Sequence, residues 1–437
     1  MPLPRDRVFL LLLLLAALLG LGYNAAILLG YGPDEPRHMS YVKLLFDEHT
    51  LPRLNPDGSE YHGAHTFHPP LYYLILLPIY ALFHTLPGAA GWHIVRLVSL
   101  LLCLSSLPLI YQIAERAGGG DRNVARLAVA QVALLPMFGM TAGTINNDSA
   151  VLPAVTVFLW LLAVKYPAER GLKAAAVLGV CLGLGGLCKA TALLCDAVAL
   201  LFYLLMQDGW KTFVRTQTWA RIGVIAALTA LLAGPWHVRS MLLYGTWTPL
   251  PQRMPTPFLP DPARYGALMT LFHPNFPSVL AYANWRLFYT LWSQKDWIPE
   301  TVRQSVYLLL AVYCMLGLGG AAFAAIRRRR AREEPPPTDQ RIAVLCPEAA
   351  FVVNWLAVIQ VAMFVHWGWS EGGRYLIPTL SGLSIFLARG WRGILGPRAF
   401  SALTAAWIIA LLTLNALTLY WLLHYLNPTF GVLKLTP

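Results

Sequence analysis

Charge is scarce in this 437-residue sequence. Asp, Glu, Lys and Arg together make up only 12% of the residues, well below the ~25% typical of soluble domains. Hydrophobic residues make up 57%, and the mean hydropathy is +0.55. This composition excludes an ordinary soluble globular protein and predicts a polytopic membrane protein.

Cysteine is also scarce, and the positions of the cysteines do not indicate a disulfide or a metal site. No two cysteines form a CxxC pair, and all lie in or beside apolar runs: Cys103, Cys181, Cys188, Cys195, Cys314 and Cys346. We therefore expect neither a disulfide framework nor a metal site built from cysteines.

A concentrated basic patch is missing too, although the formal net charge is +12. The Lys and Arg residues are distributed between apolar runs instead of gathering with stacking aromatics, which argues against a nucleic-acid partner. The first apolar run, Val8 to Leu29, exceeds the ~7–15 residues of a signal-peptide core and predicts an uncleaved first helix.

The apolar runs predict an all-α polytopic protein with about eleven transmembrane helices, when runs of ~17–25 residues are taken as spans and basic loops are placed in the cytoplasm. This register puts 20 of the 33 Lys and Arg residues inside. The predicted spans are 8–30, 93–114, 127–145, 149–164, two short helices within 174–206, a seventh ending near 237, and 304–326, 347–366, 375–388 and 401–424.

We expect a single transmembrane domain over 1–437, with three notable loops. These are a first external loop at 31–92, a second long external loop at 237–301, and a basic cytoplasmic loop at 327–346. Residues 69–90 are long enough to span the membrane, but counting them as a span would invert every later basic loop. We therefore interpret 69–90 as a juxtamembrane or shallowly inserted helix.

The first external loop holds an unusual concentration of titratable groups between Tyr31 and Tyr73, including six acids and five histidines. The Asp34-Glu35 pair directly follows the first helix. One interpretation is a hydrated acid pair after a Gly-Pro turn. The other, which we favour because of the surrounding histidines, is a general base that takes a proton from an acceptor hydroxyl.

His62, His65 and His68 recur every third residue in this loop. On one helical turn they could share a zinc ion. Gly63 and the Pro69-Pro70 pair disfavour a regular helix, however, so ordinary loop histidines are the stronger interpretation.

Several later residues also have two interpretations. Lys189 lies within an apolar block, where a lysine is either functional or extends to the interface. Arg239 and the Arg374-Tyr375 pair either bind a phosphate or anchor at the lipid headgroups. Asp148 is either a helix N-cap or part of the site.

The motifs PDEPRH and HPPLYY, which open and close the polar part of the first loop, resemble the GT-C superfamily of integral membrane glycosyltransferases, near the protein O-mannosyltransferase and aminoarabinose transferase branch. LGLGGLCKAT, GPWHVRSMLLYG and GRYLIP resemble further stretches of that family, so the resemblance covers most of the chain. It implies a GT-C fold and inverting transfer of a sugar from a polyprenyl-phosphate carrier to a lipid, glycan or protein hydroxyl.

The resemblance also implies roles for particular residues. Asp34 matches the catalytic base and Glu35 its neighbour, Lys189 matches a ligand of the carrier phosphate, and Arg374 matches more loosely. The expected substrate-binding residues are His38, His68, Tyr72, Asp148, Lys189, Arg239, Arg374 and Tyr375.

The sequence departs from relatives at two points. His68 stands where several relatives have lysine, so any phosphate neutralisation there depends on its protonation. Asn146-Asn147-Asp148 replaces the paired acids of metal-dependent oligosaccharyltransferases, which does not support a divalent metal at that turn. This interpretation names no certain cofactor and leaves a divalent metal open.

The resemblance and the basic loops together predict a bacterial inner-membrane protein with a cytoplasmic N-terminus and an active site on the periplasmic or external face. The main alternative is a membrane transporter or flippase of a lipid-linked or polar solute. A transporter would favour two similar halves with midplane charges, and the sequence shows no internal repeat.

Overall fold

The computed structural model describes residues 4–55, 57, 59–87, 89–247, 256–292, 300–364 and 372–426. Over these ranges the chain is helical, and an isolated bridge between Leu54 and Glu60 is the sole β-type pairing. The predicted all-α class is confirmed.

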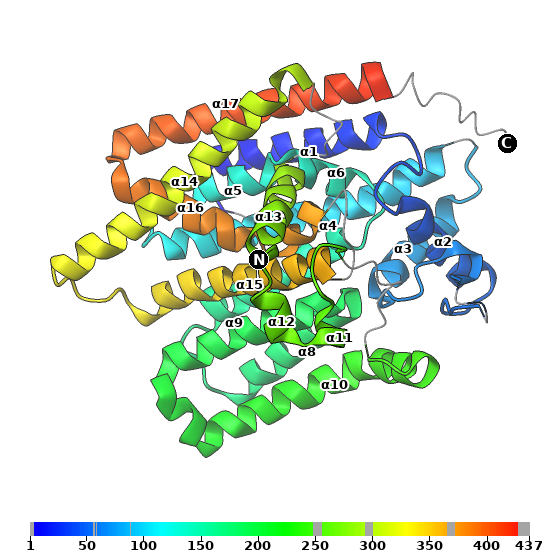
Figure 1. The fold of residues 1–437 in the computed structure, drawn as a ribbon, viewed down its shortest axis with the longest axis horizontal. Coiled ribbons are helices and arrows are strands. Elements are labelled where there is room, and N and C mark those ends of the chain that lie inside the picture. The colour runs from blue at the N-terminus through cyan, green and yellow to red at the C-terminus, as the bar shows by residue number, and fades with distance from the viewer. Residues whose placement is uncertain are drawn as a thin grey trace.

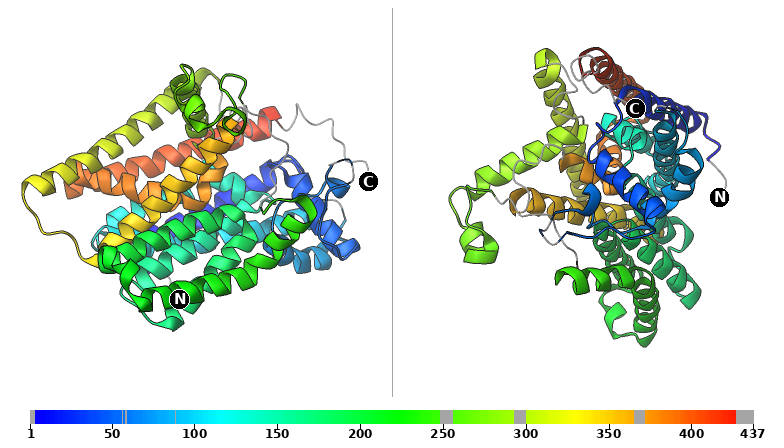
Figure 2. Two further views of the ribbon diagram at one scale, coloured as in Figure 1. Left: turned by 60° about the horizontal axis from the view of Figure 1, so that its bottom comes forward. Right: turned by 90° about the vertical axis from the view of Figure 1, so that its right-hand side faces the viewer.

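Long helices run side by side in one bundle, and two short helices lie across one end of it (Figures 1 and 2). The α-helices are α1 (Arg7–Ala26), α2 (Glu35–Asp47), α3 (Leu71–Phe83), α4 (Ala90–Ala117), α5 (Arg122–Ala133), α6 (Pro136–Gly143), α7 (Asp148–Trp160), α8 (Leu172–Cys188), α9 (Ala190–Asp208), α10 (Thr216–Tyr244), α11 (Pro262–Tyr265), α12 (Ala267–Leu271), α13 (Phe276–Trp292), α14 (Glu300–Arg330), α15 (Thr338–Phe364), α16 (Leu380–Ile394) and α17 (Pro397–Trp421). Shorter 3-10 and π turns are η1 (Tyr61–Gly63), η2 (Leu161–Lys165), η3 (Gly209–Val214), η5 (Gly372–Thr379) and η6 (Leu422–Leu426).

Within the described ranges, eight helices are long and apolar enough to cross a membrane, or nine if the bent pair α5 and α6 forms one span. The chain is therefore a polytopic membrane protein, but the predicted count of about eleven is not confirmed. The difference lies in α8 and α16, which have 17 and 15 residues and fall short of the ~20 that an untilted span needs.

Two predicted helix boundaries are corrected at prolines. The expected span 127–145 is broken into α5 and α6, which meet at 58° just before Pro136. Proline lacks the N–H that would continue α5, whereas the first turn of a new helix accommodates it. The seventh helix is predicted to end near 237, just after Pro235, but α10 continues through this proline to Tyr244. Membrane helices tolerate such a proline.

Other expectations agree with the structure. The block 174–206 forms two helices, α8 and α9, that meet at Lys189. The predicted juxtamembrane segment 69–90 contains the 13-residue α3, which packs against α2 and α4. By contrast, helices occupy much of the segments predicted as loops: α13 lies within 237–301, and only 331–337 separates α14 from α15.

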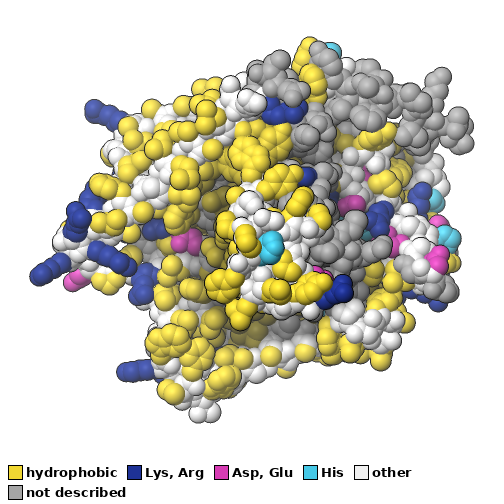
Figure 3. Space-filling model, in the orientation of Figure 1, with side chains coloured by type: hydrophobic (Ala, Val, Ile, Leu, Met, Phe, Trp, Pro, Cys, Tyr) yellow, Lys and Arg dark blue, Asp and Glu magenta, His cyan; other side chains and the backbone are white. Residues whose placement is uncertain are grey.

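One end of the bundle, which we call the basic end, gathers the loops predicted to be cytoplasmic. Long-range contacts connect these loops: Arg116 with Asp339 at 2.5 Å, Arg392 with Asp121 at 2.7 Å, and Arg126 with Asp6 at 2.9 Å. In Figure 3 Lys and Arg project at this end, on the left, and hydrophobic side chains cover the middle of the visible face.

The opposite end, which we call the cavity end, carries α2 and α3 and faces the viewer in the right-hand view of Figure 2. Here Arg239 of α10 donates a hydrogen bond to the carbonyl of Pro52 at 2.8 Å. This contact joins α10 to the loop that follows α2.

Candidate functional site

A cavity of about 300 Å³ opens at the cavity end. Its walls come from α2, the loop before α3, the start of α9, α10, α15 and η5. The lining residues are Asp34, Arg37, His38, Glu60, His65, Phe67, His68, Pro69, Asn147, Lys189, Ala190, Thr191, Trp236, His237, Trp247, Ala357, Val358, Val361, Arg374 and Tyr375. Of the ten predicted site residues, six line this cavity: Asp34, His38, His68, Lys189, Arg374 and Tyr375.

Asp34 presents a partly exposed carboxylate to the cavity, with 36% of its side chain accessible. Its backbone has φ +55° and ψ +12° and caps the start of α2 in the left-handed region, which Asp tolerates better than most residues. The Arg374 guanidinium donates to its carboxylate at 2.5 Å.

The electrostatics favour an ionised Asp34. Burial raises its pKa, but the charge and hydrogen bond of Arg374 more than offset this effect, so the pKa lies below the ordinary value of 3.8. Asp34 is therefore a carboxylate held ready to accept a hydrogen bond from a hydroxyl.

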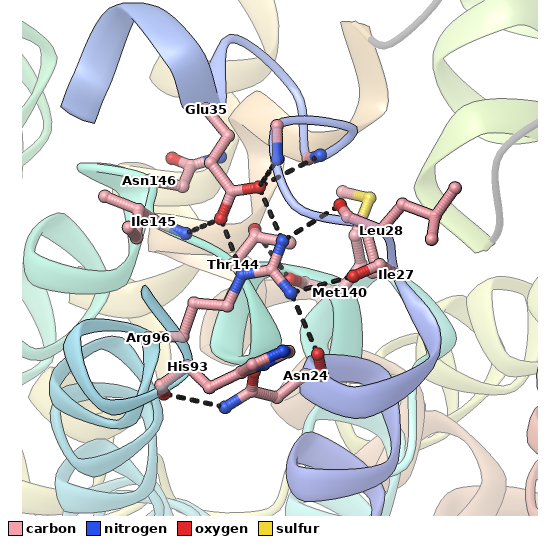
Figure 4. Close-up of polar contacts among 12 residues, drawn as sticks. Asn24, Ile27, Leu28, Glu35, His93, Arg96, Met140, Thr144, Ile145 and Asn146 are labelled. Carbon is pink, nitrogen blue, oxygen red and sulfur yellow. Dashed lines mark hydrogen bonds and ion pairs between the residues drawn. The ribbon is translucent and has the colours of Figure 1, made fainter. Parts of the chain in front are cut away.

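The adjacent Glu35 has a different environment, shown in Figure 4. Its fully buried carboxylate accepts two hydrogen bonds from the Arg96 guanidinium, at 2.6 and 2.7 Å. It also accepts backbone N–H groups of Gly30 and Gly32, at 3.0 and 3.3 Å, and of Ile145, at 2.9 Å.

Arg96 completes this buried arrangement. It donates to the carbonyls of Asn24 and Ile27 at 2.8 Å each and of Leu28 at 3.1 Å. The Glu35–Arg96 pair thus joins the end of α1, the start of α2, α4 and the end of α6. Glu35 does not line the cavity, and its contacts are those of a residue that positions Asp34.

Lys189 lies between α8 and α9, where its extended backbone ends one helix and begins the next. Its ammonium nitrogen lies 2.5 Å from the buried carboxylate of Asp148 and 4.4 Å from the ring centre of Tyr375. Arg374 donates to the Tyr375 hydroxyl at 2.7 Å. Two cations therefore share one aromatic neighbour on the cavity wall.

The structure corrects the N-cap interpretation of Asp148. α7 begins at Asp148, and Asn147 is the N-cap residue. The Asp148 carboxylate is directed to Lys189 instead, so its burial is compensated by an opposite charge.

Tyr72 and Arg239 lie outside the cavity lining. The Tyr72 hydroxyl is buried, bonds the Ser99 hydroxyl at 2.8 Å, and accepts the backbone N–H of Asn146 at 2.8 Å. Arg239 lies over Trp236 in addition to its Pro52 contact. Both residues hold elements around the site without reaching its interior.

The histidines group differently from the pattern in the sequence. His62 projects outward, with its ring nitrogen 3.1 Å from Glu48. His38, His65 and His68 instead lie together, and one ligand nitrogen from each falls within 4.8 Å of the others. Among the described residues, this second set is the one group of three or more His, Cys, Asp or Glu side chains whose ligand atoms lie close enough together to hold a metal ion.

Sequence reasoning did not include Arg96, Arg37 and Glu60 in the site, and it considered His65 only as part of the evenly spaced set with His62 and His68. An available signal for Arg96 was its place near the start of an apolar run, since intramembrane arginines are costly without a partner. Arg37 and Glu60 bond each other across the first loop, a contact that no local pattern predicts.

We compared the chain with protein-family models and with curated protein sequences. A family model described as dolichyl-phosphate-mannose-protein mannosyltransferase matches residues 67–236. No curated protein matches the chain in sequence.

Solved structures match over nearly the whole chain. ArnT from Cupriavidus metallidurans, bound to undecaprenyl phosphate, is 15% identical with a TM-score of 0.50; the match covers 90% of this chain and 61% of that chain. The Archaeoglobus fulgidus oligosaccharyltransferase in complex with zinc and sulfate is 13% identical with a TM-score of 0.51, over 94% and 53% of the two chains. AglB from Archaeoglobus fulgidus, in complex with an inhibitory peptide and a dolichol-phosphate, is 12% identical with a TM-score of 0.51, over 95% and 56%.

The chain thus spans between about half and three fifths of these proteins' lengths. The resemblance expected from the sequence is therefore confirmed at the level of the fold.

Proposed function

We propose that this protein transfers a sugar from a polyprenyl-phosphate carrier to a hydroxyl of a lipid, glycan or protein acceptor, with inversion at the anomeric carbon. Three observations support the proposal: the GT-C fold, the mannosyltransferase family match, and neighbours whose structures contain undecaprenyl phosphate or dolichol-phosphate. The reaction takes place in the cavity, on the external face of a bacterial inner membrane.

The sidedness follows from charge. Lys and Arg residues are concentrated in loops at the basic end, and cytoplasmic loops carry such an excess. The cavity end then faces outward, where a lipid carrier in the outer leaflet reaches Lys189 and Arg374 from the membrane.

In the proposed reaction, the acceptor hydroxyl attacks the anomeric carbon as the bond from that carbon to the phosphate oxygen breaks. The hydroxyl proton passes to Asp34, and the bonding electron pair leaves with the lipid phosphate. Asp34 acts as general base, and Lys189 and Arg374 stabilise the negative charge that develops on the leaving group.

The observation that carries the proposal is the convergence of one ionised carboxylate and two cations on a single cavity wall. Asp34 comes from the start of α2, Lys189 from the α8–α9 junction, and Arg374 from η5. A base and a phosphate-binding pair are the groups that this reaction needs, and they are separated in sequence by 155 and 340 residues.

The test is transfer from a panel of polyprenyl-phosphate sugars by purified wild-type protein and by Asp34→Asn. The amide keeps the shape of the side chain but cannot accept the proton, so we expect the rate to fall by about 10²- to 10⁴-fold. Asp57→Asn is the matched control, since Asp57 is an exposed carboxylate of the same loop, and should keep wild-type activity.

Near-full activity in a correctly folded Asp34→Asn protein would rule out the proposed base. If neither protein binds any of these lipids, the glycosyltransferase proposal fails, and transport assays in liposomes become the appropriate experiment.

A further inference from the structure

We propose that His38, His65 and His68 form a binding site for one divalent transition-metal ion of the zinc class, with an open coordination position that faces the cavity. The site combines a residue of α2 with two residues of the loop before α3. It differs from the evenly spaced His62, His65 and His68 set, because His62 is directed to Glu48 at the surface.

The first argument is geometric. The imidazole centres lie 4.6 Å apart for His38 and His65, 4.3 Å for His65 and His68, and 5.5 Å for His38 and His68. Ligand nitrogens of a tetrahedral zinc site, with bonds of about 2.0–2.1 Å, lie roughly 3.4 Å apart. The nitrogens here fall within 4.8 Å of one another, so modest side-chain rotations bring them onto one ion.

The second argument is the orientation of the rings. The Nδ1 atoms of His38 and His68 both bond the hydroxyl of Tyr73, at 2.8 and 3.0 Å. The opposite nitrogen, Nε2, of each ring is then the one left to bind a metal. Metal-binding histidines characteristically fix their rings through the other nitrogen in this way.

The third argument is a buried nitrogen without a partner. The Nε2 atom of His65 is buried and has no hydrogen-bond partner among the described residues, although the side chain is only 9% exposed. Its other nitrogen lies 3.8 Å from the Glu60 carboxylate. A buried polar atom of this kind is costly unless something binds it, and a metal between the three rings would do so.

The chemistry of the ligands selects the metal. Three imidazole nitrogens suit zinc and its neighbours among the transition metals, whereas magnesium and calcium prefer oxygen ligands.

Three protein ligands leave a fourth position open, which is the pattern of catalytic zinc sites and not of structural ones. All three histidines line the cavity, so the open position takes an oxygen ligand from within it. That this oxygen belongs to the sugar donor or acceptor rests on the proposed function; binding of the metal itself does not.

The experiment measures metal content of the full-length protein in detergent, with any affinity tag removed. After incubation with zinc and desalting, we expect about one zinc per wild-type chain by elemental analysis. Cobalt replacing zinc should give the visible absorption of tetrahedral coordination. His65→Gln should lose both signals, and His62→Gln, which alters a surface histidine three residues earlier, should keep both.

A second variant tests the orienting hydroxyl. Tyr73→Phe retains the ring and its packing but removes both hydrogen bonds, so zinc affinity should fall by about 10- to 100-fold. This measurement tests the site independently of His65→Gln, in case that variant does not fold.

Stoichiometric zinc in wild type and His62→Gln but not in His65→Gln supports the site. No zinc or cobalt in wild type overturns it, and so does equal metal in His65→Gln and wild type. Because metal content is measured without any substrate, these outcomes are independent of whether the protein transfers sugars.

Discussion

The buried pair of Glu35 and Arg96 gives the sharpest test of how the site is built. Glu35→Gln keeps the shape of the side chain but removes its charge and turns one acceptor oxygen into an NH₂ donor. In the native protein five N–H groups point at this carboxylate: two of Arg96 and those of Gly30, Gly32 and Ile145. Either orientation of the amide places its NH₂ against at least two of these donors.

The expected cost is large because Arg96 is completely buried. Removing one partner of a buried ion pair costs about 3–5 kcal/mol, since the remaining charge is left uncompensated. We expect the free energy of unfolding to fall by that amount. Replacing both partners, as in Glu35→Gln combined with Arg96→Met, should recover part of the loss because no uncompensated charge remains.

The assay is denaturant unfolding of the detergent-solubilised protein, with Glu48→Gln as the control. Glu48 pairs with His62 at the surface, and breaking such a pair changes stability by about 0–1 kcal/mol. If Glu35→Gln proves as stable as Glu48→Gln, the buried pair does not hold the start of α2, and the positioning role assigned to Glu35 is wrong.

Two further predictions concern the cations of the cavity. Lys189→Met leaves the buried Asp148 carboxylate without its charge partner. We therefore expect the free energy of unfolding to fall by about 3–5 kcal/mol and transfer activity to be lost. Lys189→Arg should recover part of both losses, as measured by unfolding and transfer assays in parallel. Arg374→Gln removes the charge that lowers the pKa of Asp34, so this pKa should rise. The acid limb of the profile of transfer rate against pH should then move to higher pH. An unmoved acid limb would show that Asp34 is not the group that titrates.

Local sequence patterns were sufficient to predict many of the helices in the bundle. Apolar length predicted most long helices. The block 174–206 is too long for one span, and this length predicted the two helices that meet at Lys189. The bend before Pro136 and the continuation of α10 past Pro235 were not predicted, because a proline can end a helix or be absorbed into one. Packing against neighbouring helices decides between these outcomes, and a single sequence does not specify it.

The composition of the site was harder to predict than the fold. Asp34 and Glu35 are neighbours of similar chemistry, so the sequence suggests a shared role. Their environments differ because Glu35 meets Arg96, 61 residues away, whereas Asp34 meets Arg374, 340 residues away. The grouping of the histidines could not be predicted for the same reason. Helix α2 brings His38 to the loop that holds His65 and His68, and the spacing of these residues in the sequence does not indicate that contact.

These long-range contacts also explain how a surface loop can hold the proposed base at a fixed place. A catalytic group must be held within a fraction of an ångström of its working position, yet Asp34 lies in a non-helical turn with left-handed backbone. The next residue resolves this conflict, because the Glu35 carboxylate is anchored to α4 and to the end of α6 by the buried pair. On the other side, Arg374 fixes the Asp34 carboxylate from η5. Asp34, the proposed base, is therefore held through Glu35 by α4 and the end of α6, and through Arg374 by η5.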